Sequence, residues 1–211
     1  LFTPGSGNIS WNYADLAGAF GNDQKYTISL RVTDKAGNQT APAGFQFTYD
    51  DAAPSAALTA PPGPLPAPSP NAYSNAVVST RKLLTIQGTA LEAAGSFQTG
   101  LNEIWVAVSS GSGASRLWWS TAAASFSVGP QADIYWATRT VTASPWTFND
   151  TALAAAYANG VPYAVYLKAA DAAGNSIGAV ADYNSTGVIS QTFLYENANP
   201  NAAVEAPGSA Y

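Results

Sequence analysis

One segment of this chain occurs twice, and the repetition restricts the fold more than any other feature. Residues 26–38 read Tyr-Thr-Ile-Ser-Leu-Arg-Val-Thr-Asp-Lys-Ala-Gly-Asn, and residues 163–175 read Tyr-Ala-Val-Tyr-Leu-Lys-Ala-Ala-Asp-Ala-Ala-Gly-Asn. Matching residues flank the segment on both sides: Trp11 with Trp146, Phe47 with Phe193, and Pro54 with Pro200. Repeats of this kind are typical of tandem modules, so we expect an array that spans distance or presents surfaces.

The offsets between the copies predict where the units begin and end. We expect the C-terminal part of one unit in residues 1–50, a complete unit in residues 51–197, and a linker with the first segment of a following unit in residues 198–211. Each junction pairs an acidic residue with a proline, at 50–54 and again at 196–200. Proline stiffens a connection and holds the preceding residue extended, which suits a linker between domains.

Alternating apolar residues predict strands in both copies. Tyr26, Ile28 and Leu30 share one face, as do Tyr163, Val165 and Leu167, so each copy is expected to be a half-buried strand. Each strand leads into a turn in which glycine takes a positive φ and Asp or Asn bonds nearby amides. The turn residues are Asp34, Gly37 and Asn38 in one copy and Asp171, Gly174 and Asn175 in the other.

The rest of the chain also predicts an all-β fold. Further strands are expected at 45–49, 56–59, 82–88, 103–109, 117–120, 125–128, 138–143, 145–149 and 190–195. Residues 151–157 are alanine-rich and favour one helical turn. Six prolines between residues 61 and 70 exclude that stretch from a sheet interior.

Composition excludes several classes of function. The chain has no Cys and no His, which rules out disulfides, thiolate zinc sites and Ser-His-Asp or Cys-His catalytic centres. A net charge of −5 disfavours nucleic acid and anionic membrane surfaces as partners, and no apolar run is long enough for a membrane span. Most carboxylates fall in turns and linkers, so we expect no enzyme. The low charge and small-residue loops favour an extracellular or cell-surface location.

The order of these motifs resembles the bacterial immunoglobulin-like repeats of large surface and adhesion proteins. The matching elements of the later unit are Gly88-Thr89, Trp119, Trp146, Tyr163, 171–175 and 193–200, and those of the earlier unit are Trp11, Tyr26, 34–38 and 47–54. The resemblance covers essentially the whole chain. It implies immunoglobulin-like β-sandwich repeats in tandem, with a structural or adhesive role outside the cell.

The sandwich core can be anticipated from two residue types. In immunoglobulin folds a tyrosine near the start of the penultimate strand ties the adjoining corner and stands two residues before a core Cys. Tyr26 with Ile28, and Tyr163 with Val165, have that spacing, with an aliphatic residue in place of Cys. We expect Trp11 and Trp146 to supply packing that replaces the missing disulfide.

Calcium is the one metal that the residue types suggest, and no other cofactor is expected. Hard cations bind clustered oxygen atoms. We expect such clusters where a terminal loop of one unit meets the next, formed by Asp34, Asp50 and Asp51, or by Asp171, Glu196 and Asn197. Turn and linker formation is the alternative explanation of these residues, because no Asp-x-Asp-x-Asp-Gly run occurs and Lys35 adjoins Asp34.

Exposed tryptophans are the other binding candidates. Trp105 has opposite parity to its apolar neighbours, so it is expected to face outward, and adjacent Trp118 and Trp119 must point to opposite faces, one buried and one exposed. Trp136 lies beside a predicted loop. Trp105, Trp118 and Trp136 are therefore candidates for stacking on sugars or on a protein, unless they cover the core edge or a neighbouring unit.

These observations favour a non-enzymatic extracellular module of a surface stalk or filament. Its expected partners are neighbouring units or other copies of the chain, and a glycan or a host or cell surface is a further candidate. Two alternatives stay open. One is a carbohydrate-binding module. The other is a self-assembling filament subunit completed by strand addition between chains, because residues 1–50 hold only the last strands of a sandwich.

Overall fold

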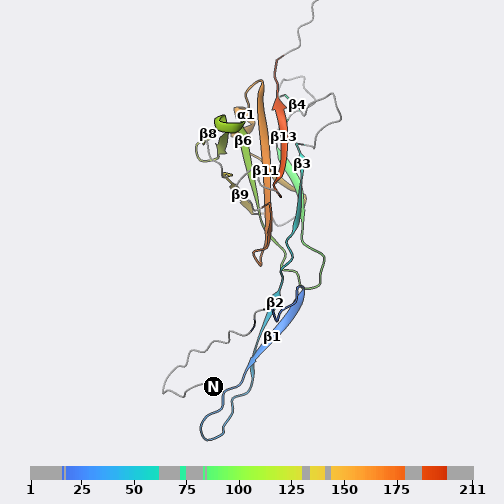
Figure 1. Cartoon of the computed structure of the whole chain (residues 1–211), viewed down its shortest axis with the longest axis vertical. Helices are drawn as coiled ribbons and strands as arrows, with labels where there is room; N and C mark the ends of the chain where they lie inside the picture. Colours follow the sequence, from blue (N-terminus) through green and yellow to red (C-terminus); the bar gives the residue numbers. More distant parts are fainter. Residues whose placement is uncertain are drawn as a thin grey trace, which may run out of the picture.

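Strands form nearly all of the regular structure in the part of the chain that is described. The structure is a computed structural model, and it describes residues 16, 18–61, 72–74, 83, 85–129, 134–140, 144–178 and 187–198. A β-sandwich is followed along the long axis by a separate two-stranded hairpin (Figure 1). The predicted all-β, immunoglobulin-like sandwich is therefore confirmed in architecture.

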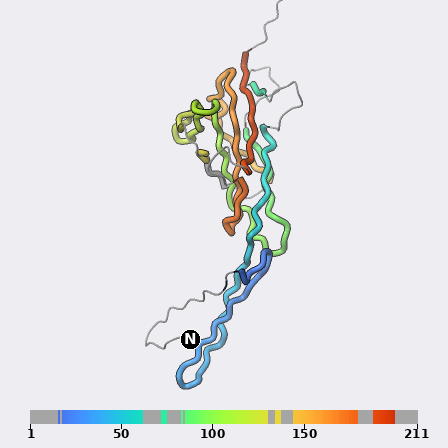
Figure 2. Tube along the Cα trace, viewed as in Figure 1, coloured from blue at the N-terminus to red at the C-terminus, as the bar shows by residue number. Residues whose placement is uncertain are grey.

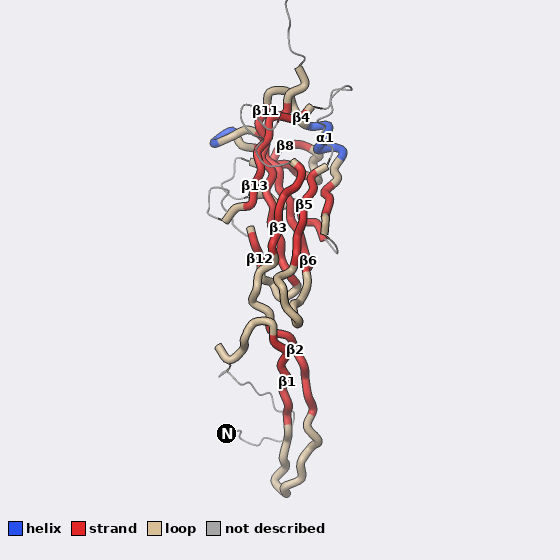
Figure 3. The backbone as a smooth tube through the Cα atoms, turned by 90° about the vertical axis from the view of Figure 1, so that its right-hand side faces the viewer, coloured by secondary structure: helices blue, strands red, loops and turns tan. Residues whose placement is uncertain are grey.

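The sandwich consists of two sheets. The smaller has the order β10 (Trp146–Phe148), β5 (Ile86–Leu91) and β3 (Ser55–Ala60). The larger has the order β4 (Ala72–Tyr73), β13 (Ile189–Tyr195), β11 (Val161–Asp171), β6 (Leu101–Ser110), β7 (Leu117–Ser120) and β8 (Ser125–Val128). Two short strands add to it, β9 (Ala137–Thr140) on β6 and β12 (Ser176–Ile177) on β11. Figure 3 shows this sandwich and the hairpin beyond it.

Most predicted strands are present. Of the predicted strand at 82–88, residues 82 and 84 lie outside the described residues, as do residues 141–143 of the strand predicted at 138–143. The predicted helical turn is α1 (Thr151–Ala156), and a 3₁₀ turn, η1 (Gly113–Ser115), was not anticipated. Asp150 caps α1, since its side chain accepts the amides of Ala152 and Leu153 and also the indole N–H of Trp119 at 2.9 Å.

Strand β11 forms the centre of the molecule and is buried on both faces. Tyr163, Val165 and Leu167 point into the main core, as their alternation predicts. The opposite face was expected to be solvated. It is instead covered by a second cluster that contains Ala107, Trp118, Ile134, Ala164 and Tyr166. A strand of mixed polarity can therefore be buried on both faces, because residues of other elements cover its second face. The alternation within the strand does not reveal this cover.

The hairpin has the same apolar pattern but a different environment. β1 (Gln24–Leu30) pairs with β2 (Ala43–Tyr49), which sets Ile28 opposite Phe45 on one face. Ile28 is 40% exposed, Leu30 39% and Phe45 67%. The prediction of a half-buried strand is thus wrong for this copy among the described residues, because no second sheet faces it; Figure 2 shows the hairpin extending past the sandwich. Trp11 lies outside the described residues.

Both copies share an aromatic cluster and a tyrosine corner. Tyr26 accepts the Gly21 amide at 2.7 Å through its hydroxyl oxygen, and Tyr163 accepts the Ala158 amide at the same distance. The predicted corner is therefore present twice. The rings around it also correspond: Phe20, Tyr26, Phe47 and Tyr49 in the hairpin, and Tyr157, Tyr163, Phe193 and Tyr195 in the sandwich.

Trp146 is a core residue, as predicted from the sequence. It is 2% exposed and lies on β10 opposite Gly88 of β5. A Cβ atom at residue 88 would stand 2.2 Å from the indole Cζ2 and 2.3 Å from the Ala57 carbonyl oxygen. Glycine in this strand therefore provides the space that the indole fills.

Candidate metal centre

The repeated Asp-to-Asn turn has one geometry in both copies. The Asp34 carboxylate accepts the Asn38 amide at 2.8 Å and its side-chain Nδ2 at 2.7 Å, and Asp171 accepts the same two groups of Asn175 at 2.9 Å each. Gly37 and Gly174 both have a positive φ, as predicted. Hydrogen bonds, led by that of the Asn38 side chain, hold the pKa of Asp34 below its ordinary value.

The two turns differ in their surroundings. The turn of 34–38 is exposed at the far tip of the hairpin, whereas the turn of 171–175 meets the residue at which the hairpin ends. There Asn175 Nδ2 also donates to the backbone oxygen of Asp50 at 3.0 Å, and the Ala173 amide donates to Thr99 Oγ1 at 3.1 Å. The second turn is therefore part of a junction.

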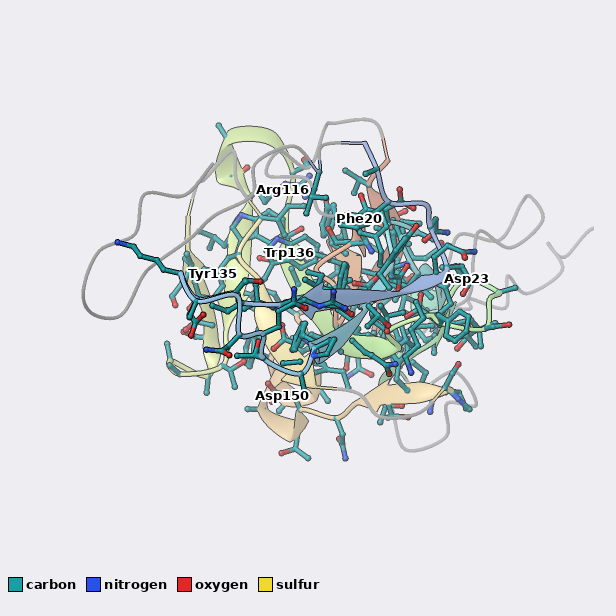
Figure 4. All side chains as sticks on the ribbon, turned by 90° about the horizontal axis from the view of Figure 1, so that it is seen from below. Phe20, Asp23, Arg116, Tyr135, Trp136 and Asp150 are labelled. Carbon is teal, nitrogen blue, oxygen red and sulfur yellow. The ribbon has the colours of Figure 1, made fainter. Side chains whose placement is uncertain are left out.

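The loop between β5 and β6 also contacts the hairpin at this junction, because groups of the loop donate hydrogen bonds to hairpin carboxylates. Asp50 accepts the Thr99 amide and the Thr99 hydroxyl, both at 2.9 Å. Asp23, labelled in Figure 4, accepts the amides of Ser96 and Phe97. Burial raises the pKa of Asp50, but the hydrogen bonds from Thr99 and Ala52 outweigh it, so the net pKa is lowered and the group is ionised at neutral pH.

Three carboxylates meet at the same place. One carboxylate oxygen each from Asp50, Glu92 and Asp171 lies within 4.8 Å of the others. Asp50 is 7% exposed and Asp171 is 1% exposed. Glu92 Oε1 accepts the Ala93 amide, while its buried Oε2 has no hydrogen-bond partner among the described residues. Burial, with Asp171 and Asp50 nearby, raises the pKa of Glu92.

This donor set matches a hard divalent cation. Calcium binds oxygen at about 2.3–2.6 Å, so two ligands on opposite sides of one ion stand about 5 Å apart. Three oxygens within 4.8 Å therefore fit around a single ion. Each Asp171 oxygen accepts a single N–H from Asn175 and so retains a lone pair for a metal. Zinc is disfavoured because the chain offers no Cys or His.

Comparison with known families agrees with this architecture. A sequence profile described as bacterial Ig-like domain matches residues 2–51 and 67–186, together most of the chain. The chain belongs to the bacterial Ig-like domain family. Such domains are generally non-catalytic and are commonly parts of extracellular surface proteins. No match was found among curated proteins or among solved structures.

In the described part of this Ig-like chain, no helix has both the length and the apolar character needed to cross a bilayer.

The expected grouping of the acidic residues is corrected by the topology of the Ig-like unit. Asp34 and Asp50 lie at opposite ends of β2, and Asp171 and Glu196 lie at opposite ends of β13. A seven-residue strand separates its ends by about 20 Å, so neither predicted group converges. The turn of the sandwich instead meets the end of the hairpin, which brings Asp50 to Asp171. Asp51, Glu196 and Asn197 are exposed.

Glu92 was not among the predicted calcium ligands. The predicted ligands lie in motifs that occur in both copies, whereas Glu92 lies in the β5–β6 loop, which has no counterpart within this chain. The one indication in the sequence was that Glu92 closely follows the Gly88-Thr89 motif, since the loop after β5 lies at the end of the sandwich that meets the hairpin. The division of the chain at residues 50 and 197 stays a prediction.

The tryptophan candidates have distinct environments. Trp119 is in the main core, and Trp118 faces the opposite side but is fully buried, so the expectation that one of the pair is exposed is wrong. Arg116, whose guanidinium carbon lies 5.7 Å from the Trp118 ring centre, covers it. Trp105 faces outward beneath Lys168, whose Nζ is 4.1 Å from the ring centre. Trp136 is half-buried against the second cluster, on the side where Figure 4 labels Arg116.

Proposed function

We propose that this chain is a non-enzymatic spacer of an extracellular surface protein, built from Ig-like units in tandem whose junction is closed by calcium. The observation that carries the proposal is the origin of the three carboxylates. Asp50 belongs to the hairpin, whereas Glu92 and Asp171 belong to the sandwich. One ion bound by all three would tie the two parts together.

Direct contacts support a fixed orientation across the junction. Asp23 and Asp50 both accept hydrogen bonds from the loop of residues 96–99, and Asn175 donates back to the Asp50 carbonyl oxygen. Bonds to charged acceptors stabilise by about 1.5–3 kcal/mol each when they are shielded from water. Several such bonds at separate points resist both bending and rotation, which is the property a spacer needs.

The need for a cation follows from the charges. The groups that act electrostatically on Glu92 are the two neighbouring carboxylates, and both raise its pKa. Bringing three carboxylates together costs free energy unless a positive charge joins them. Calcium supplies that charge with the ligand type it prefers. The junction would then be stiff when calcium is present and looser when it is removed.

Spin-label distances test this proposal directly. The chain has no Cys, so labels can be placed at Ala36→Cys in the hairpin turn and Ala122→Cys in the sandwich, both exposed. We expect a single narrow distance distribution with calcium and a broad one with chelator or in Asp50→Asn. Asp51→Asn removes the same charge one residue away, outside the cluster, and should leave the distribution narrow. A width insensitive to calcium and to Asp50→Asn contradicts the proposal.

A second candidate function is assembly with other copies into a filament. It is favoured by the apolar face of the hairpin, where Ile28, Leu30 and Phe45 are 39–67% exposed. Light scattering across a concentration series would show rising mass, lost on Phe45→Ser; a constant monomer mass ends this candidate. The carbohydrate-binding alternative retains only Trp105 and Trp136, since Trp118 is buried.

A further inference from the structure

The backbone is held by the same hydrogen bonds where the chain leaves the last strand of the sandwich and where it leaves the last strand of the hairpin. Below the internal junction, Asn22 Oδ1 accepts the amide of Asp51 at 2.9 Å. At the other end of the sandwich, Asn159 Oδ1 accepts the amides of Asn197 at 2.6 Å and Ala198 at 3.1 Å. The tyrosine corner next to each asparagine is also the same. The chain therefore leaves β2 and β13 along equivalent paths.

Glu196 occupies the place that Asp50 has at the internal junction. It directly follows β13, as Asp50 directly follows β2. Its backbone amide donates to the Tyr73 carbonyl oxygen at 2.9 Å, which fixes the main chain, and its side chain is exposed. At the internal junction the corresponding carboxylate is buried because the β5–β6 loop of the sandwich covers it.

We propose that Asn159, Glu196 and Asn197 form a docking surface for one more Ig-like unit. The β5–β6 loop of that unit would donate its N–H and hydroxyl groups to Glu196, as Thr99 donates to Asp50. Residues 200–207, Pro-Asn-Ala-Ala-Val-Glu-Ala-Pro, match residues 54–61, Pro-Ser-Ala-Ala-Leu-Thr-Ala-Pro, which include β3 of the sandwich. The inference rests on the proposed function, since it extends the fixed junction to a second one.

A residue difference between the surface at Asp50 and the surface at Glu196 constrains the loop that can dock on the latter. Gly160 stands where the hairpin has Asp23. At Gly95 of the facing loop, a Cβ would come within 2.6 Å of the Asp23 carboxylate carbon and within 2.3 Å of Gln98 Nε2. The docking surface at Glu196 has no such carboxylate at Gly160, so its partner loop needs donors for a single acid.

The test uses the full chain extended by its own unit, with residues 52–197 placed a second time after Asn197. Spin labels at Ala122→Cys and at the same alanine of the added unit report the new junction. Labels at Ala36→Cys and Ala122→Cys report the internal one. We expect narrow distributions at both. The double change Asn159→Ala with Glu196→Ala should abolish the narrow peak at the new junction alone, and the exposed Asn149→Ala is the matched control.

The outcomes separate the two proposals. A broad distribution at the new junction of the unsubstituted chain, beside a narrow internal one, overturns the docking surface and leaves the proposed function standing. Broad distributions at both junctions overturn both. A narrow new junction that is unchanged by the double substitution also overturns the inference, because the linker alone would then set the geometry.

Discussion

The half-buried carboxylate of Glu92 makes the junction sensitive to pH. Its pKa is raised above the ordinary value of 4.5, so the folded chain holds this proton more tightly than the unfolded chain. The resulting stability is fully present below pH 4.5 and is lost as the pH rises through the folded pKa. Asp50 has the opposite sign, since its pKa is lowered and its contribution disappears only as the pH falls below 3.8.

We therefore expect the melting temperature in metal-free buffer to fall as the pH rises from 4.5 towards neutrality. Glu92→Gln removes the titrating group and should flatten this dependence while raising the melting temperature at neutral pH. Thermal unfolding followed by circular dichroism with chelator present measures both effects. A wild-type slope that persists in Glu92→Gln would assign the dependence to another group.

The packing of Trp146 against β5 requires glycine at position 88. Gly88→Ala places a Cβ 2.2 Å from the Trp146 ring, and overpacking of this kind costs about 1–3 kcal/mol. Gly44→Ala is the matched control, since a Cβ there meets only a Thr27 methyl at 3.5 Å. Chemical denaturation should show a loss for the first and little change for the second. Equal midpoints would mean that the indole can move aside.

At the scale of elements, β10 depends on its tryptophan. Trp146→Ala leaves a large cavity between β10 and the rest of the core, and such truncations cost about 3–5 kcal/mol. We expect a sharply lower melting temperature for the sandwich. An unchanged melt would show that this tryptophan does not replace the missing disulfide.

The two turns offer a matched pair at the same scale. Asn38→Ala and Asn175→Ala each remove a bond to the preceding aspartate, but only Asn175 also donates to Asp50. We expect Asn175→Ala to reduce the free energy of unfolding of the sandwich by about 1–3 kcal/mol and so to lower its melting temperature. Asn38→Ala should leave that melting temperature unchanged. Similar losses in the two variants would show that the bond across the junction contributes nothing.

Local patterns predicted the elements well, and contacts between units poorly. Alternation located β11 and β13, and the Asp-to-Asn motif located its turn, because both features depend on neighbours in sequence. The exposure of Ile28, the burial of Trp118 and the approach of Glu92 to Asp50 depend on which element lies opposite. The same apolar spacing is consequently buried in one copy and exposed in the other.

For the whole molecule, the repeat explains why the carboxylates of one acidic cluster come from two sides. A strand separates each turn from the end of its own copy, so the sandwich turn at Asp171 meets the end of the hairpin instead. In the proposed array, Asp34 and Glu196 would take the places of Asp171 and Asp50 at other junctions. Junctions held by such acidic residues would give that array a similar bend and length at each unit.

Calorimetric titration of the full chain with calcium tests the central claim most directly. We predict binding of one ion per chain for the wild type and for the control Asp51→Asn, and no binding for Asp50→Asn or Glu92→Gln. Since the ligands come from the hairpin and the sandwich, the bound ion should also raise the melting temperature. A wild-type titration without heat, with no shift in the melt, would contradict the account.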